Sequence, residues 1–131
     1  MDEEIRDPDR SKRRAGFLPD VLDSSVIAFP LMERLNNEPD RLHHIVIDLN
    51  LNFPGGREAA RKRVAEVVDQ LSQANSQHEL SSDPGSQYVF ATLDAETIRA
   101  IVRLDREMAE GSSMQRAIFH VWPDFEIQAL T

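Results

Sequence analysis

Residues 88–107 read YVFATLDAETIRAIVRLDRE, and the change of periodicity inside this stretch decides the predicted fold. From Tyr88 to Leu93, successive residues fall into two alternating sets, which is typical of a β-strand. Asp94 then stands where a helix N-cap belongs, and the apolar residues between Ala95 and Met108 follow at helical spacing. The stretch therefore predicts a strand that leads directly into an amphipathic helix.

The sequence on either side repeats this alternation of strand and helix. Residues 42–52 (LHHIVIDLNLN) alternate with period two, which predicts a strand, and residues 57–73 carry one apolar helical face. Residues 77–80 predict a short strand only weakly, whereas residues 116–122 (RAIFHVW) predict a clear one. Residues 125–130 are expected to be extended.

The resulting order of strand, helix, weak strand, strand, helix and strand is typical of an α+β, ferredoxin-like domain with two helices on one face of an antiparallel sheet. We expect this domain to occupy residues 42–131, because a chain of 131 residues suits one domain. Residues 1–41 mix opposite charges and prolines without periodicity, which favours a mostly disordered or loosely docked N-terminal tail. Within this tail, residues 26–32 (VIAFPLM) are apolar enough to dock on the domain or to pair as an edge segment that Pro30 would stop.

The composition excludes several classes of function. With 15 basic and 23 acidic residues, the chain has a net charge of −8, which disfavours nucleic acid as a partner. The lack of cysteine excludes disulfides and thiolate zinc sites. His43 and His44 are adjacent and point to opposite strand faces, whereas His78 is expected in a loop and His120 on another strand. Three of these side chains are not expected to converge on a metal, and we expect no cofactor. No apolar run is long enough for a membrane helix and the acidic start is not a secretory signal, so we expect no membrane partner and a cytoplasmic location.

The predicted strands are apolar on both faces, although the outer face of an antiparallel sheet is usually polar. The face without helices is therefore expected to carry an aromatic and aliphatic patch, and such a patch commonly marks a partner surface. The alternative is that the N-terminal tail folds back and covers this face. The predicted patch consists of Tyr88, Phe90, Ile118, His120 and Trp122.

Three stretches together resemble the propeptides of subtilisin-like serine proteases. They are residues 43–56 (HHIVIDLNLNFPGG), residues 89–107 (VFATLDAETIRAIVRLDRE) and residues 116–124 (RAIFHVWPD). The resemblance extends over residues 26–131 and rests on the order and spacing of the elements and on the bend after the last strand.

The resemblance implies a protein that inhibits a subtilisin-like serine protease, assists its folding, and is not itself an enzyme. Such propeptides lay the free face of their sheet on the protease and run their C-terminal segment into the substrate cleft as a product-like peptide. On this chain, Gln128, Ala129, Leu130 and Thr131 would lie in the cleft, with Thr131 nearest the catalytic serine.

Other interpretations stay open. The 131 residues carry no recognisable protease motif and no signal peptide, which favours a separately encoded inhibitor over an excised propeptide of a longer precursor. Gly55, Gly56 and Arg57 at a strand-to-helix junction would suit an anion site of an acylphosphatase-like enzyme, although a tight turn with a solvated arginine explains them as well. Stacking of bases on Phe90 and Trp122 would instead make the domain a ferredoxin-like binding module, but basic residues are sparse on these strands.

Overall fold

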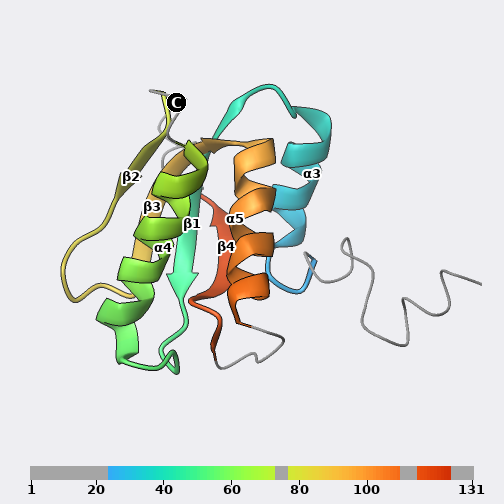
Figure 1. Cartoon of the computed structure of the whole chain (residues 1–131). Helices are drawn as coiled ribbons and strands as arrows, with labels where there is room; N and C mark the ends of the chain where they lie inside the picture. Colours follow the sequence, from blue (N-terminus) through green and yellow to red (C-terminus); the bar gives the residue numbers. More distant parts are fainter. Residues whose placement is uncertain (1–23, 73–76, 110–114, 125–131) are drawn as a thin grey trace, which may run out of the picture.

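The computed structural model describes residues 24–72, 77–109 and 115–124. These ranges form an α+β fold in which one antiparallel sheet, with strand order β2-β3-β1-β4, is covered by helices on one side (Figure 1). In chain order the elements are α3 (Phe29–Asn37), β1 (Leu42–Leu49), α4 (Gly56–Ser72), β2 (Glu79–Ser81), β3 (Tyr88–Asp94), α5 (Ala95–Met108) and β4 (Ile118–Pro123).

The junction between β3 and α5 forms as the sequence predicts. Alternate residues of β3 are buried, with Val89 and Leu93 facing the helices. Asp94 is the N-cap of α5, where its side chain accepts a hydrogen bond of 2.8 Å from the backbone N–H of Thr97. That bond satisfies one of the free amides of the first helical turn and stops the strand at this residue.

Strand β1 is the centre of the sheet because it pairs with β3 on one side and with β4 on the other. Ile45, Ile47 and Leu49 on one face of β1 are fully buried beneath the helices. The opposite face of β1 carries the residues that alternate with them, and no helix of the described ranges packs there. The core is therefore one layer between the sheet and the helices.

The turn before α4 depends on two glycines. Gly55 and Gly56 have φ angles of 93° and 81°, which side chains other than glycine rarely adopt. A Cβ atom on Gly55 would also lie 2.8 Å from the Cβ of Ala59. The helix that follows begins at Gly56 and ends at Ser72, one residue earlier at each end than predicted, and β2 occupies the position of the weakly predicted strand.

The α+β class and the antiparallel sheet are confirmed, but the described residues contain three helices where the sequence predicts two. The additional helix is α3, which lies beside α5 (Figure 1). The side chain of Arg99 on α5 donates a hydrogen bond to Asn36 on α3. No helix in the described ranges is long and apolar enough to cross a bilayer.

Residues 26–35 contribute buried side chains to the core, so the domain boundary expected between residues 41 and 42 is wrong for this part of the chain. Ile27, Leu31 and Leu35 are fully buried. The backbone of residues 26–28 also pairs with β4, because Val121 N–H donates to Val26 and Ala28 N–H donates to Val121, each at 2.9 Å. Pro30 does not end a strand here but occupies the first turn of α3, a position that favours proline. Residues 1–23 lie outside the described residues.

Candidate functional site: the open face of the sheet

The side of the sheet opposite the helices is exposed and rich in aromatic side chains. Tyr88, Phe90 and Trp122 each keep 41–43% of their surface exposed, and Phe119 keeps 50%. Large aromatic groups at such exposure on one surface are uncommon on a protein that has no partner. We call this surface the open face, and its residues are His44, Val46, Asp48, Tyr88, Phe90, Thr92, Phe119, His120 and Trp122.

The strand register brings these residues together from three strands. Val46 on β1 lies directly opposite Phe90 on β3 and Trp122 on β4. Asp48 lies opposite Tyr88 and His120 in the same way. Directly opposed residues on a sheet have Cβ atoms only about 5 Å apart, so the aromatic groups flank the central strand as one continuous surface.

Strict alternation along β4 assigns one residue, Ile118, to the wrong face of the sheet. Ile118 is only 2% exposed and lies opposite Leu49 in the core, whereas the neighbouring Phe119 is exposed. The cause is a β-bulge, since the pairing between β1 and β4 shifts between Asp48 and Leu49 and leaves Phe119 as an extra residue on β4. A one-residue slip of this kind transfers side chains to the other face. Ile118 is therefore a core residue, and Phe119 takes its place on the open face.

Three rings on β4 form a row. The rings of Phe119 and His120 have centroids 4.2 Å apart, and those of His120 and Trp122 have centroids 5.9 Å apart in an edge-on arrangement. These separations lie in or close to the range in which ring pairs attract each other. The predicted site residues Tyr88, Phe90, His120 and Trp122 thus lie on one surface, and Phe119 is the member that the prediction missed.

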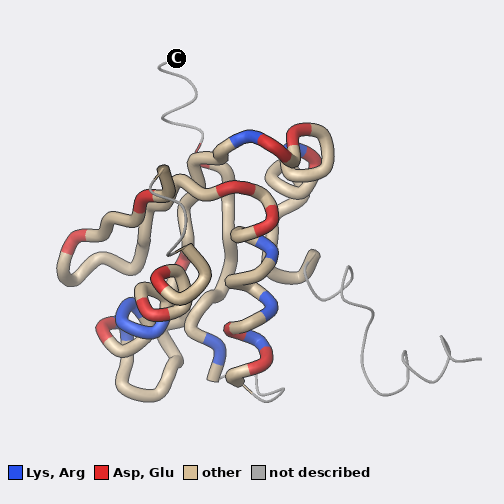
Figure 2. Tube along the Cα trace, turned by 45° about the horizontal axis from the view of Figure 1, so that its top comes forward, with Lys and Arg blue, Asp and Glu red and all other residues tan. Residues whose placement is uncertain are grey.

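The polar groups of the open face are mostly engaged with one another. Asp48 accepts a hydrogen bond of 2.9 Å from the side chain of Gln87, and His44 shares one of 3.0 Å with Thr92. Among the open-face residues defined above, none is lysine or arginine. Figure 2 shows acidic and basic residues along α4 and α5, on the other side of the molecule. The open face therefore combines apolar rings with hydrogen-bonded polar groups on the central strand β1.

Two segments of the chain were expected to bear on this face, the N-terminal tail and the segment that follows β4. Of the two expectations for the face, cover by the N-terminal tail is not met by residues 24–41, because α3 packs on the helix side. At the other end, Asp124 N–H donates to His44 at 2.9 Å, which ties the end of β4 to β1. The predicted inhibitory segment Gln128, Ala129, Leu130 and Thr131 lies outside the described residues.

The candidate anion site at the start of α4 has a structural role instead. Arg57 donates to the carbonyl oxygen of Gly85, and Arg61 donates to that of Ser86, so both guanidinium groups hold the loop before β3. Glu58 accepts a hydrogen bond of 3.2 Å from the N–H of Gly85. The hydrogen bond from Arg61, followed by that from Gly85, lowers the pKa of Glu58. Arg57 is therefore engaged with the protein backbone, as expected for a turn and not for an anion grip.

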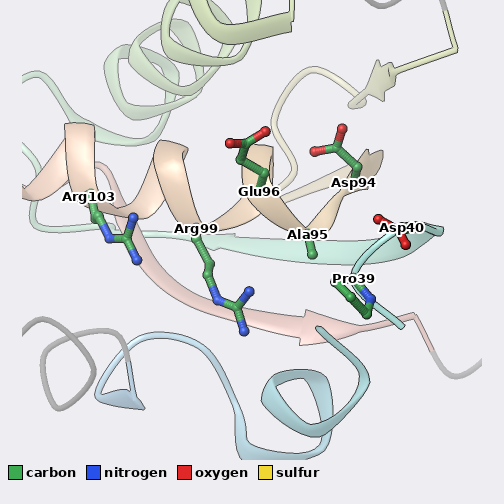
Figure 3. A pocket seen from close by; sticks show the side chains of 7 residues that line it. All are labelled: Pro39, Asp40, Asp94, Ala95, Glu96, Arg99 and Arg103. Carbon is green, nitrogen blue, oxygen red and sulfur yellow. The ribbon is translucent and has the colours of Figure 1, made fainter. Parts of the chain in front are cut away.

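A hollow of about 470 Å³ lies where the loop after α3 meets the start of α5 (Figure 3). Acidic and basic side chains line it together, and Figure 3 shows Arg99 and Arg103 extending from α5 toward α3. Asp94 in its wall already caps α5. The mixture of charges gives the hollow no clear preference for an anion or a cation.

The histidines are dispersed and serve local contacts. His43 makes a hydrogen bond of 2.9 Å with the carbonyl of Glu38, and Nε2 of His78 lies 3.4 Å from the carboxylate of Asp94. Within the ranges that the structure describes, no group of three or more histidine or carboxylate side chains is arranged to hold a metal ion.

No family model, no curated protein and no solved structure matches this chain. The observations define a class, namely a small α+β domain whose helices cover one face of an antiparallel sheet and leave an aromatic face open. The function is therefore argued from this face.

Proposed function

We propose that the chain is a ferredoxin-like domain that binds and inhibits a subtilisin-like serine protease and assists its folding. The order of elements from β1 to β4 and the strand order β2-β3-β1-β4 support this fold assignment, with α3 as an addition before β1. The similarity of residues 43–56, 89–107 and 116–124 to subtilase propeptides supports the protease as the partner.

The observation that carries the proposal is the exposure of the aromatic open face. Burial of these rings against a partner removes apolar surface from water, and aromatic residues are enriched at the centres of protein interfaces. Phe90 and Trp122 flank Val46, so the centre of the face is apolar, and His44 and Asp48 lie on β1 before and after it. An apolar centre with a polar rim is the common anatomy of a protein–protein interface.

The second part of the proposal concerns the segment that follows β4. In the proposed complex this segment lies extended in the substrate cleft, where backbone hydrogen bonds supply affinity and alternate side chains fill the subsites. Gln128, Ala129, Leu130 and Thr131 are the residues assigned to the cleft. The inhibitor occupies the cleft as a cleaved product does, and the sheet contact holds it there.

Two variants of the full chain separate these two contacts. Phe90→Glu places a charge on the open face, and a deletion of residues 128–131 removes the proposed cleft segment while leaving the described residues intact. We expect each to weaken inhibition of a bacterial subtilisin, measured by hydrolysis of a chromogenic peptide, by about tenfold or more, since central interface residues contribute at least about 1.4 kcal/mol.

The matched control is Phe29→Glu, because Phe29 is 72% exposed, lies at the start of α3 and is not one of the open-face residues. This variant is expected to inhibit as the wild type does, with unchanged circular dichroism. Equal inhibition by wild type, Phe90→Glu and the deletion would contradict the proposal. Refolding of denatured subtilisin in the presence of each variant tests the folding role with the same set of proteins.

A further inference from the structure

The bulge in β4 decides which residues reach the open face, and this bulge has an identifiable support. The backbone N–H groups of Ala117 and Ile118, immediately before the extra residue Phe119, are directed toward α5. Both donate hydrogen bonds of 3.0 Å to the carboxylate of Asp105 on α5, one to each oxygen.

The surroundings of Asp105 favour this contact. Its side chain is almost completely buried, and Nη1 of Arg63 on α4 lies 3.9 Å from the same carboxylate. Burial raises the pKa of Asp105, while the amide hydrogen bonds from Ala117 and Ile118 act in the opposite direction. A buried charged residue on a helix face that otherwise packs in the core needs such partners.

The same short segment is also held from the other side. The N–H of Asn50 donates to the carbonyl of Ala117 at 2.8 Å, and the Asn50 side chain donates to the carbonyl of Arg116 at 2.7 Å. Residues 116–118 are thus fixed between α5 and the end of β1. From this segment the chain enters β4 in the register in which Ile118 is buried and Phe119 is exposed.

We infer that Asp105 is a positioning residue for protease binding: its carboxylate fixes the β4 bulge and thereby adds Phe119 to the row of rings that contacts the partner. The inference rests on the proposed function. The partner is the same subtilisin-like protease, because β4 ends at Pro123 and the chain that follows it, residues 125–131, is the segment proposed to enter the cleft. A protease that holds this segment lies next to β4, where Phe119, His120 and Trp122 are exposed or partly exposed.

A carboxylate suits this position better than an amide does. Asp105→Asn keeps the size of the side chain but presents one acceptor and one NH₂ group, so one of the two backbone N–H groups loses its acceptor. Phe119→Ser removes the exposed ring without touching the core. If Asp105 acts on binding through Phe119, the two substitutions affect binding non-additively.

The experiment is a double-mutant cycle on the full chain, with inhibition of bacterial subtilisin measured for wild type, Asp105→Asn, Phe119→Ser and the double variant. We expect each single substitution to weaken inhibition by about tenfold. In the Phe119→Ser background, Asp105→Asn should cause no further loss. Thermal unfolding of each variant ensures that all measurements are made on folded protein.

Two outcomes of the cycle overturn the inference: unchanged inhibition by Asp105→Asn, or the same loss in both backgrounds. Ring-to-ring NMR contacts between Phe119 and His120 supply a readout that needs no protease, and Asp105→Asn should weaken them. If these contacts persist in folded Asp105→Asn, Asp105 does not position Phe119. If wild type fails to inhibit subtilisin while Asp105→Asn loses the ring contacts, the proposed function fails, and only the structural part of the inference stands, namely that Asp105 positions Phe119 on the open face.

Discussion

Single residues set the ends of the elements and the composition of the open face. Asp94 ends β3 and caps α5, and Gly55 permits a turn that a Cβ atom would block. Asp105 holds the start of β4. The first two roles follow from the sequence, because an N-cap aspartate and a glycine pair have local signatures. The role of Asp105 does not follow from the sequence, because its partners, the N–H groups of Ala117 and Ile118, are distant from it along the chain.

The charge of Asp94 gives a prediction about pH. Burial, the largest single influence, raises the pKa of Asp94, but the hydrogen bonds from Thr97 and the contact with His78 together outweigh it and lower the pKa. A carboxyl whose pKa is lower in the folded state stabilises the fold above its unfolded pKa, about 4, and loses this effect as pH falls through the folded pKa.

The comparison is with Asp94→Asn, which keeps an oxygen acceptor for the helix cap but has no charge. We expect wild type to exceed Asp94→Asn in free energy of unfolding at neutral pH, and the difference to shrink toward about pH 2. Urea unfolding at both pH values measures this difference. A difference that does not change with pH would show that the charge of Asp94 contributes nothing.

At the scale of elements, the periodicity of apolar residues was sufficient to predict each helix or strand that has one clear buried face. The observed bounds differ by at most a few residues from the predicted ones for β1, β3, α4 and α5. Helix α3 was missed because its buried stripe within residues 29–37 is narrow, and because Pro30 suggested a stop. Its place is decided by long-range contact with β4 and α5, which no local pattern contains.

The open face was predicted from the alternation of residues along the strands. The wrong assignment of Ile118 to this face has the same origin as the missed helix α3, namely contacts between residues distant in the sequence. Alternation assumes one uniform register, whereas the bulge at Phe119 depends on residues 50 and 105, which lie on other elements. Of the predicted face, Tyr88, Phe90, His120 and Trp122 lie together as expected, and only Ile118 is in the core. The cleft segment, residues 128–131, stays a prediction.

The packing of α3 predicts that residues 24–41 unfold together with the sheet. Leu35→Ala removes a fully buried side chain and should lower the free energy of unfolding by about 2–5 kcal/mol. Phe29→Ala on the same helix removes an exposed ring and should change it by less than about 0.5 kcal/mol. Urea unfolding, followed by circular dichroism, gives both values. If the two variants were equally stable, α3 would not belong to the cooperative core.

At the scale of the whole molecule, the two sides have different compositions. The helix side carries the charged residues of α4 and α5, while the open face carries exposed rings without lysine or arginine among its defined residues. This division explains how a chain with a net charge of −8 can present an apolar surface. The charge favours solubility, and the open face is left to bind a partner.

The most direct test of protease binding through the open face is an NMR titration of the full chain with subtilisin whose catalytic serine is replaced by alanine. The account predicts that backbone amide signals of β1, β3 and β4, including those of Val46, Phe90 and Trp122, shift or broaden, while those of the exposed side of α4 stay unchanged. Changes confined to α4 and α5, or no change at saturating protease, would contradict it.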